Sequence, residues 1–217
     1  MLSNYELSLA IFGGIFSLII PYVILRGLRG PKKPKGSILE DGGSSSEVNR
    51  TPVNSISFLI VIIGIVIFCF YFLRLLGHCL GNSWETSELY AQAIQLPKWI
   101  NYLGIAVFWF SGILKASVKV FNINLTPCFM PMKEGYTLAT GGPYKFVRHP
   151  KYLSEILTVL SLFMMTGIKE LIIGFICSLF IVFQANSEEK ALQKIFGKDW
   201  DDYALKTGMF IPKLTKR

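Results

Sequence analysis

Two polar clusters in the carboxyl-terminal half of the chain contain the residue types that could do chemistry. The first, residues 142–152, reads Gly-Pro-Tyr-Lys-Phe-Val-Arg-His-Pro-Lys-Tyr, and the second, residues 188–203, begins with two glutamates and ends in Asp-Trp-Asp-Asp-Tyr. Histidine and carboxylates can transfer protons, arginine can bind an anion through two parallel hydrogen bonds, and aromatic faces attract cations. The two clusters together indicate a binding site for a charged ligand.

The first cluster has a backbone that favours a cavity wall. Pro143 and Pro150 bracket it, and each lacks an amide donor, so the segment cannot be one continuous helix. Non-helical backbone at membrane depth is tolerated where it is buried in protein or lines a cavity. We therefore predict that this segment forms one wall of a cavity.

Each candidate residue also has a simpler structural explanation. His149 could be a structural histidine at headgroup level, and Arg148 could be one more basic residue flanking the membrane. Glu188 and Glu189 could be the solvated start of a helix, where carboxylates are favoured. Because consecutive helical residues point about 100° apart, we do not expect both glutamates to share one direct role. We interpret Trp200 as an interface aromatic.

The apolar content of the chain indicates a membrane protein. It has 217 residues, of which 52% are hydrophobic. A helix needs about 20 mostly apolar residues to span a bilayer, with about 17 tolerated. The candidate segments are 7–25, 56–76, 99–118, 152–168 and 171–185. We predict an all-α polytopic bundle of about five transmembrane helices, the last two short, plus a C-terminal cytosolic helix.

The distribution of the net charge of +8 predicts the orientation of the chain in the membrane rather than nucleic-acid binding. Lysines and arginines follow the first, third and fifth apolar segments, whereas residues 81–96 carry Glu85 and Glu88. An excess of Lys and Arg marks cytoplasmic flanks. We therefore expect both polar clusters and the C-terminus on the cytosolic side, of the endoplasmic reticulum membrane in a eukaryote or the cytoplasmic membrane in a prokaryote. The four scattered cysteines predict no metal site, and the oligomeric state stays open.

The sequence also suggests a division into two regions. Residues 1–97 contain two apolar helices joined by a linker, 27–53, rich in Gly, Ser, Pro and Lys, which we expect to be mobile. Residues 98–217 contain both polar clusters and are the predicted catalytic core.

The two clusters and their separation resemble the isoprenylcysteine carboxyl methyltransferase family, and more loosely its phospholipid N-methyltransferase relatives. The shared pattern is Gly-Pro-Tyr-x-x-Val-Arg-His-Pro-x-Tyr at 142–152, then a helical hairpin, then Glu-Glu-x-x-Leu-x-x-x-Phe-Gly-x-x-aromatic-x-x-Tyr at 188–203. A Phe-Ile-Pro tail at 210–212 completes it. The resemblance covers roughly 104–214, about half of the chain.

The resemblance implies S-adenosylmethionine as cofactor, bound on the cytosolic side, and a lipid or prenylated-peptide substrate that enters from the bilayer. Carried over by position, Glu188 or Glu189 would contact the cofactor's amino acid part or the reacting groups. Arg148 is not carried over in this way. It is our best candidate, ahead of a lysine, to bind a substrate carboxylate, because a guanidinium can form two parallel hydrogen bonds. The remaining cofactor-pocket residues would be Pro143, Tyr144, His149, Pro150, Tyr152, Leu192, Phe196 and Tyr203.

One departure from the pattern leaves the methyl acceptor open. The carboxyl methyltransferases place an arginine about one turn before the glutamate pair, but residues 183–187 read Phe-Gln-Ala-Asn-Ser. Gln184 can donate a hydrogen bond but supplies no charge. The first prediction is O-methylation of the C-terminal carboxylate of a prenylated cysteine, and the alternative is phospholipid N-methylation.

A second class of enzyme and a non-enzymatic membrane protein are further alternatives. The NADPH-dependent sterol and steroid reductases have a similar His-Pro-Asn-Tyr stretch, followed by an acidic residue and a Gly-x-Asp-Trp-x-x-Tyr stretch. Residues 197–203 fit the latter and Glu155 supplies the acidic residue, but Lys151 stands in place of the asparagine. The chain is also short for that fold.

Overall fold

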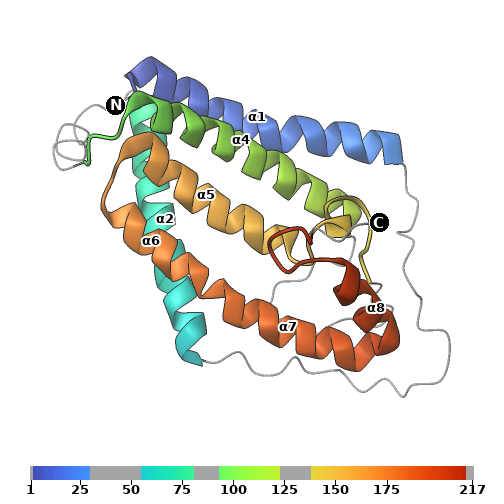
Figure 1. Ribbon diagram of the computed structural model, residues 1–217. Helices are drawn as coiled ribbons and strands as arrows, with labels where there is room; N and C mark the ends of the chain where they lie inside the picture. Colours follow the sequence, from blue (N-terminus) through green and yellow to red (C-terminus); the bar gives the residue numbers. More distant parts are fainter. Residues whose placement is uncertain (1, 30–54, 81–92, 123–137, 214–217) are drawn as a thin grey trace.

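The computed structural model describes residues 2–29, 55–80, 93–122 and 138–213, and these residues are mostly helical (Figure 1). They form no strand, and a single bridge joins Val147 to Gly208. The elements are α1 (Asn4–Arg29), α2 (Ser55–Cys79), α4 (Lys98–Phe121), the 3-10 turn η1 (Gly142–Lys145), α5 (Pro150–Thr166), α6 (Glu170–Leu179), α7 (Ile181–Phe196) and α8 (Lys198–Lys206). The prediction of an all-α bundle is confirmed.

Four helices are long and apolar enough to cross a membrane: Tyr5–Leu28, Ile56–Gly77, Lys98–Phe121 and Glu170–Phe196. The last of these contains α6 and α7, so the fifth apolar segment is part of a 27-residue helical span, and the prediction that it is short was wrong. The fourth predicted segment forms α5, which has 17 residues. At 1.5 Å per residue α5 is about 25 Å long, shorter than the roughly 30 Å hydrocarbon core.

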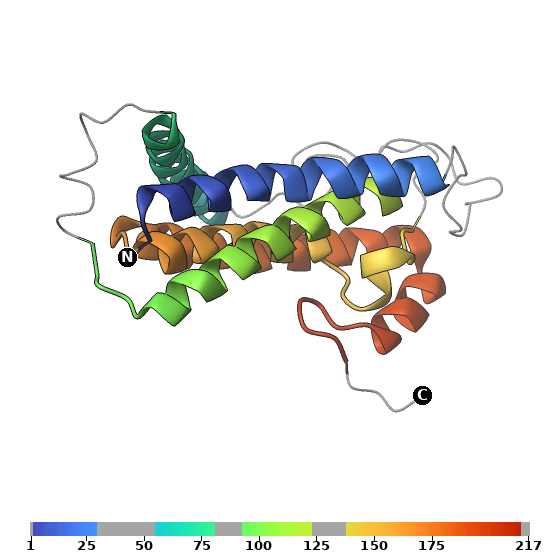
Figure 2. The ribbon, with the colours of Figure 1, turned by 90° about the horizontal axis from the view of Figure 1, so that it is seen from above.

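The helices pack as a layer with α2 laid across it. Helix α4 lies between α1 and α5, α6 follows α5, and α2 packs mainly on α6. Figure 1 shows α2 crossing the other helices steeply, and Figure 2, seen from above, shows it standing out from their layer. The main apolar core includes Ile11 of α1, Leu75 of α2, Phe108 of α4 and Leu162 of α5. The two N-terminal helices therefore share one core with residues 98–213.

Helix α5 begins and ends where its sequence requires. Pro150 occupies its first turn, where a missing amide costs nothing, and the helix ends at Gly167, which has a φ of 71°. The Gly167 amide donates to the carbonyl of Phe163, and a Cβ at Gly167 would collide with the carbonyl oxygen of Ile94. The last three residues of the first polar cluster therefore belong to the first turn of α5. Most of the predicted linker, 30–53, lies outside the described residues.

Candidate active site

The first polar cluster is held in place by the C-terminal segment of the chain. The amide of Arg148 donates to the carbonyl of Gly208 at 2.8 Å, and the amide of His149 donates to the carbonyl of Met209 at 3.1 Å. The Phe210 ring lies 5.9 Å from the His149 ring, centroid to centroid. These contacts satisfy the backbone of a non-helical segment and fix the directions of the side chains that follow η1.

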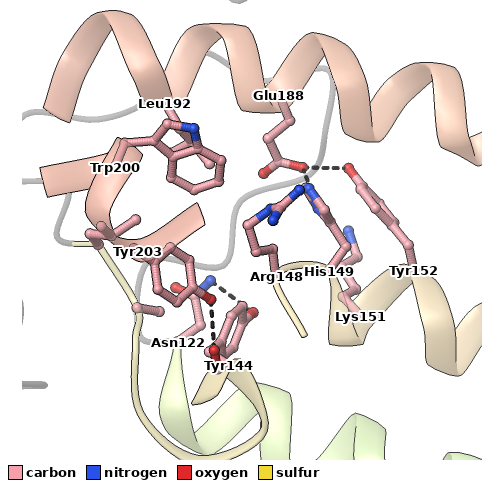
Figure 3. A pocket seen from close by; sticks show the side chains of 12 residues that line it. Asn122, Tyr144, Arg148, His149, Lys151, Tyr152, Glu188, Leu192, Trp200 and Tyr203 are labelled. Atoms are coloured by element: carbon pink, nitrogen blue, oxygen red, sulfur yellow. Dashed lines mark hydrogen bonds and ion pairs between the residues drawn. The ribbon is translucent and has the colours of Figure 1, made fainter. Parts of the chain in front are cut away.

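Glu188 and Glu189 lie inside α7, which begins at Ile181, so the interpretation of the pair as the start of a helix was wrong. Both carboxylates point back toward the first cluster but bind different partners. The Tyr152 hydroxyl donates to Glu188 Oε2 at 2.8 Å, and His149 Nδ1 lies 3.8 Å from the same oxygen. The His149 and Tyr152 rings stack at 5.4 Å. Figure 3 shows the Glu188 carboxylate directed at these two side chains, with dashed lines marking both contacts.

Glu189 pairs with Arg148. Arg148 Nε donates to Glu189 Oε1 at 2.8 Å, and Nη2 donates to Oε2 at 3.3 Å. His149 Nε2 lies 3.1 Å from the same Oε1. The remaining guanidinium nitrogen, Nη1, donates to the carbonyls of Ala204 and Thr207. All three guanidinium nitrogens of Arg148 therefore already have protein acceptors.

A second hydrogen-bond chain fixes the aromatic side of the site. Asn122 Nδ2 donates to the Tyr144 hydroxyl at 3.1 Å, and the Tyr203 hydroxyl donates to the Tyr144 carbonyl at 2.7 Å. Burial raises the pKa of the Tyr203 hydroxyl above its ordinary range, so this hydroxyl remains a donor at neutral pH. Trp200 is only 5% exposed and contacts Tyr203 edge to face at 5.7 Å.

These residues enclose a small cavity with one carboxylate in its wall (Figure 3). Its lining residues are Asn122, Leu138, Ala139, Tyr144, Arg148, His149, Lys151, Tyr152, Glu188, Leu192, Trp200 and Tyr203. Its volume is about 50 Å³, whereas small-molecule pockets typically measure about 300–1,000 Å³. A ligand of nucleoside size therefore requires the aromatic residues or α8 to move outward.

The cavity contains most of the residues that the sequence predicted as a cofactor site. Tyr144, Arg148, His149, Tyr152, Glu188, Leu192 and Tyr203 line it. Pro143, Pro150 and Phe196 do not line it. Pro150 is buried at the start of α5, and Phe196 packs beside Leu192 and Trp200. Glu189 is not in the lining either, because it is turned toward Arg148.

Sequence reasoning missed several lining residues. Trp200 is buried in the cavity wall, so its interpretation as an interface aromatic was wrong. Asn122 directly follows α4, and its position after an apolar segment does not by itself indicate a role in the site. Lys151 lies inside the motif, at a position that the resemblance left variable. It places its ammonium 5.4 Å from the centre of the Tyr152 ring.

The fold and the site define a polytopic helical membrane protein with a polar, carboxylate-containing cavity beside the middle of α7. The profile of the phospholipid methyltransferase family matches residues 99–199, slightly less than half of the chain. This part of the chain is therefore similar to the phospholipid methyltransferase family, which falls in the same superfamily as the isoprenylcysteine carboxyl methyltransferases. No curated protein matches the chain closely enough to be reported as a relative. The family implies a methyltransferase with a methyl donor of the S-adenosylmethionine type.

Proposed function

We propose that this protein transfers a methyl group from S-adenosylmethionine to the amine of a membrane lipid, at a site on the cytosolic side. The observation that carries the choice of acceptor is the pairing of Arg148 with Glu189 while Glu188 remains in the cavity wall. The match to the phospholipid methyltransferase family supports the same acceptor class.

The chemistry of the cavity suits the methyl donor. S-adenosylmethionine supplies a methyl group on a positively charged sulfur. A nucleophile attacks the methyl carbon in line with the carbon–sulfur bond and displaces the sulfur. Tyr144, Tyr152, Trp200 and Tyr203 offer aromatic rings to a cation and to a flat base, and Glu188 offers a carboxylate. Arg148 and Glu189 neutralise each other, so Glu188 is the carboxylate left to match a cationic ligand.

Within the site, binding and orientation account for most of the catalysis. Holding donor and acceptor in line removes much of the entropic part of the barrier, and excluding water strengthens the electrostatic interactions. A lipid amine is mostly protonated at neutral pH and must lose a proton before its lone pair can attack. Glu188, oriented by the Tyr152 hydroxyl, is the group that we assign to accept this proton. Arg148 then acts as a positioning residue for Glu189 and the C-terminal segment.

The prenylcysteine carboxylate is less well supported as an acceptor. A carboxylate needs a free cationic or hydrogen-bonding partner. Arg148 already donates to Glu189 and to two backbone carbonyls, and Gln184 stands near the place where the carboxyl methyltransferases have their arginine. Apart from Arg148, Lys151 is the cation among the described residues that line the cavity, and it would have to bind the carboxylate.

Two measurements test the proposal. The first compares thermal stabilisation of the detergent-solubilised protein by S-adenosylmethionine and by NADPH, and only the former should stabilise it. The second follows transfer of a labelled methyl group to phosphatidylethanolamine or to a farnesylated cysteine analogue. Base-stable label in the phospholipid is the expected result. Base-labile label in the cysteine analogue alone would restore the carboxyl methyltransferase assignment, and stabilisation by NADPH alone would favour the reductase class.

A further inference from the structure

A second, larger cavity lies within the helical bundle beside the polar one. Its volume is about 380 Å³, within the range of lipid- and drug-sized pockets. Residues of α2 and α5 make most of its wall, and those of α2, among them Val61, Ile65 and Phe68, are apolar. Lys151 and Tyr152 line both cavities, so the two are neighbours separated by the start of α5. An apolar chain in the second cavity would therefore end beside the polar site.

Most of the neutral polar groups in this apolar wall are already satisfied, but one is not. The Thr158 hydroxyl donates to the Ser154 carbonyl at 2.7 Å, and the Ser178 hydroxyl donates to the Phe175 carbonyl at 2.6 Å. Gln184, in contrast, is 5% exposed, and its side-chain nitrogen has no hydrogen-bond partner. A buried amide donor without an acceptor is unfavourable, and a ligand oxygen in the cavity would satisfy it.

Charged groups in the same wall leave an excess of positive charge. Lys115, Lys151 and Glu155 line the cavity together and interact electrostatically. Among the described residues, neither lysine has a carboxylate within the 4.0 Å that defines an ion pair. The lining of this cavity thus holds two lysines and one carboxylate, whereas the next carboxylate, Glu188, lies in the wall of the polar cavity. An anion is therefore favoured beside the two lysines, and a cation beside Glu188.

We propose that Lys115, Lys151 and the Gln184 side-chain amide form the subsite for the phosphodiester of the lipid acceptor. The inference rests on the proposed function and identifies which residues select a phospholipid over another lipid amine. Two lysines and one amide donor match a phosphodiester oxyanion in the sign of charge and in hydrogen bonding, and Glu188 in the adjoining cavity matches the lipid amine. The lipid chains then occupy the apolar wall, and the amine extends past Tyr152 toward Glu188.

The chain offers a matched control for the alternative that Lys115 only extends to the headgroup region. Lys119 lies on the same helix one turn later, is exposed and does not line the cavity. If Lys115 merely extended its ammonium to the headgroup region, its substitution would have the same effect as substitution of Lys119. We therefore compare Lys115→Met and Gln184→Leu with Lys119→Met.

The experiment measures methyl transfer in mixed micelles to phosphatidylethanolamine and to a long-chain alkylamine that lacks phosphate. Lys115→Met should raise KM for the phospholipid about ten-fold, which corresponds to about 1.4 kcal/mol, and Gln184→Leu should raise it less. Lys119→Met should leave it unchanged. KM for the alkylamine and stabilisation by S-adenosylmethionine should not change in any of the three variants.

The possible failures are distinguishable. An unchanged KM for the phospholipid in Lys115→Met, or an equal rise for both amines, overturns the subsite and leaves the proposed function intact. If the wild-type protein methylates neither amine, the proposed function fails. Thermal stabilisation by a soluble short-chain phosphatidylethanolamine then decides the subsite alone: loss of that stabilisation in Lys115→Met supports it, and its persistence overturns it.

Discussion

Arg148 binds Glu189 side-on, with Nε 2.8 Å from Oε1 and Nη2 3.3 Å from Oε2. The pair joins the segment before α5 to the middle of α7, and the side chains are 11% and 18% exposed. Because Nη1 also binds the carbonyls of Ala204 and Thr207, one guanidinium connects three parts of the chain. The principal effect of Arg148 is therefore to hold these three parts of the site in position.

Arg148→Lys is expected to destabilise the protein, since an ammonium cannot reproduce the two parallel bonds and the carbonyl contacts of the guanidinium. Loss of a hydrogen bond to a charged group costs about 1.5–3 kcal/mol. Thermal unfolding in detergent should show a lower midpoint. Lys145→Met, at an exposed position in the same segment, is the control and should leave the midpoint unchanged. A stable Arg148→Lys protein with normal S-adenosylmethionine affinity but no methyl transfer would instead make Arg148 a substrate-binding residue.

Tyr152→Phe is expected to weaken S-adenosylmethionine binding about ten-fold while the protein stays folded. The change removes the hydroxyl that donates to Glu188 at 2.8 Å and keeps the ring that stacks on His149. A hydrogen bond to a charged group typically contributes about 1.5–3 kcal/mol, which sets the expected size of the effect. Binding can be measured by calorimetric titration in detergent.

The control for this prediction is the same substitution elsewhere. The Tyr102 hydroxyl donates to Glu6 Oε1 at 2.7 Å, within the helix pair α1 and α4. Tyr102→Phe should leave the affinity unchanged. Equal affinities of the wild-type protein and Tyr152→Phe would show that the Glu188 orientation does not matter to the methyl donor.

Gly208→Ala is expected to disrupt the C-terminal segment that holds the first polar cluster. A Cβ at this position would collide with the carbonyl oxygen of Ile211, and the Gly208 carbonyl accepts the Arg148 amide. We expect a lower unfolding midpoint, faster proteolysis of the C-terminus and loss of activity. Gly77→Ala, on a helix where a Cβ meets nothing within 4 Å, should be neutral or slightly stabilising. A Gly208→Ala protein as stable and active as wild type would show that this pairing is dispensable.

The charge pattern predicts that residues 45 and 83 lie on opposite sides of the membrane. Both fall outside the described residues, so this prediction rests on the sequence: basic residues flank the linker, and Glu85 and Glu88 follow Ser83. Ser45→Cys and Ser83→Cys, each in a protein without its four native cysteines, are labelled with an impermeant thiol reagent in sealed vesicles. Only one of them should react before permeabilisation. Reaction of both from the same side would contradict the predicted topology.

Much of the architecture could be predicted from the sequence because membrane spans follow local rules. A long apolar segment has to form a helix in lipid, since every backbone group must be satisfied within it. The predicted segment 152–168 differs from α5 by two residues at each end, because Pro150 begins the helix and Gly167 ends it for equally local reasons. The two polar clusters could be assigned to one site, and the structure does bring 142–152 and α7 together.

The partner of each side chain was decided by tertiary structure alone. Arg148 and Glu189 are 41 residues apart in sequence, and Tyr203 and Tyr144 are 59 apart. Helical periodicity indicates which face of α7 each glutamate occupies. The side chains that this face contacts depend on the distances and angles between α5, α7 and α8. For this reason the sequence could name Glu188 and Glu189 together without separating a cavity carboxylate from a structural ion pair. The burial of Trp200 depends on the same approach: α8 turns back after Gly197 and presses the indole against Leu192 and Phe196.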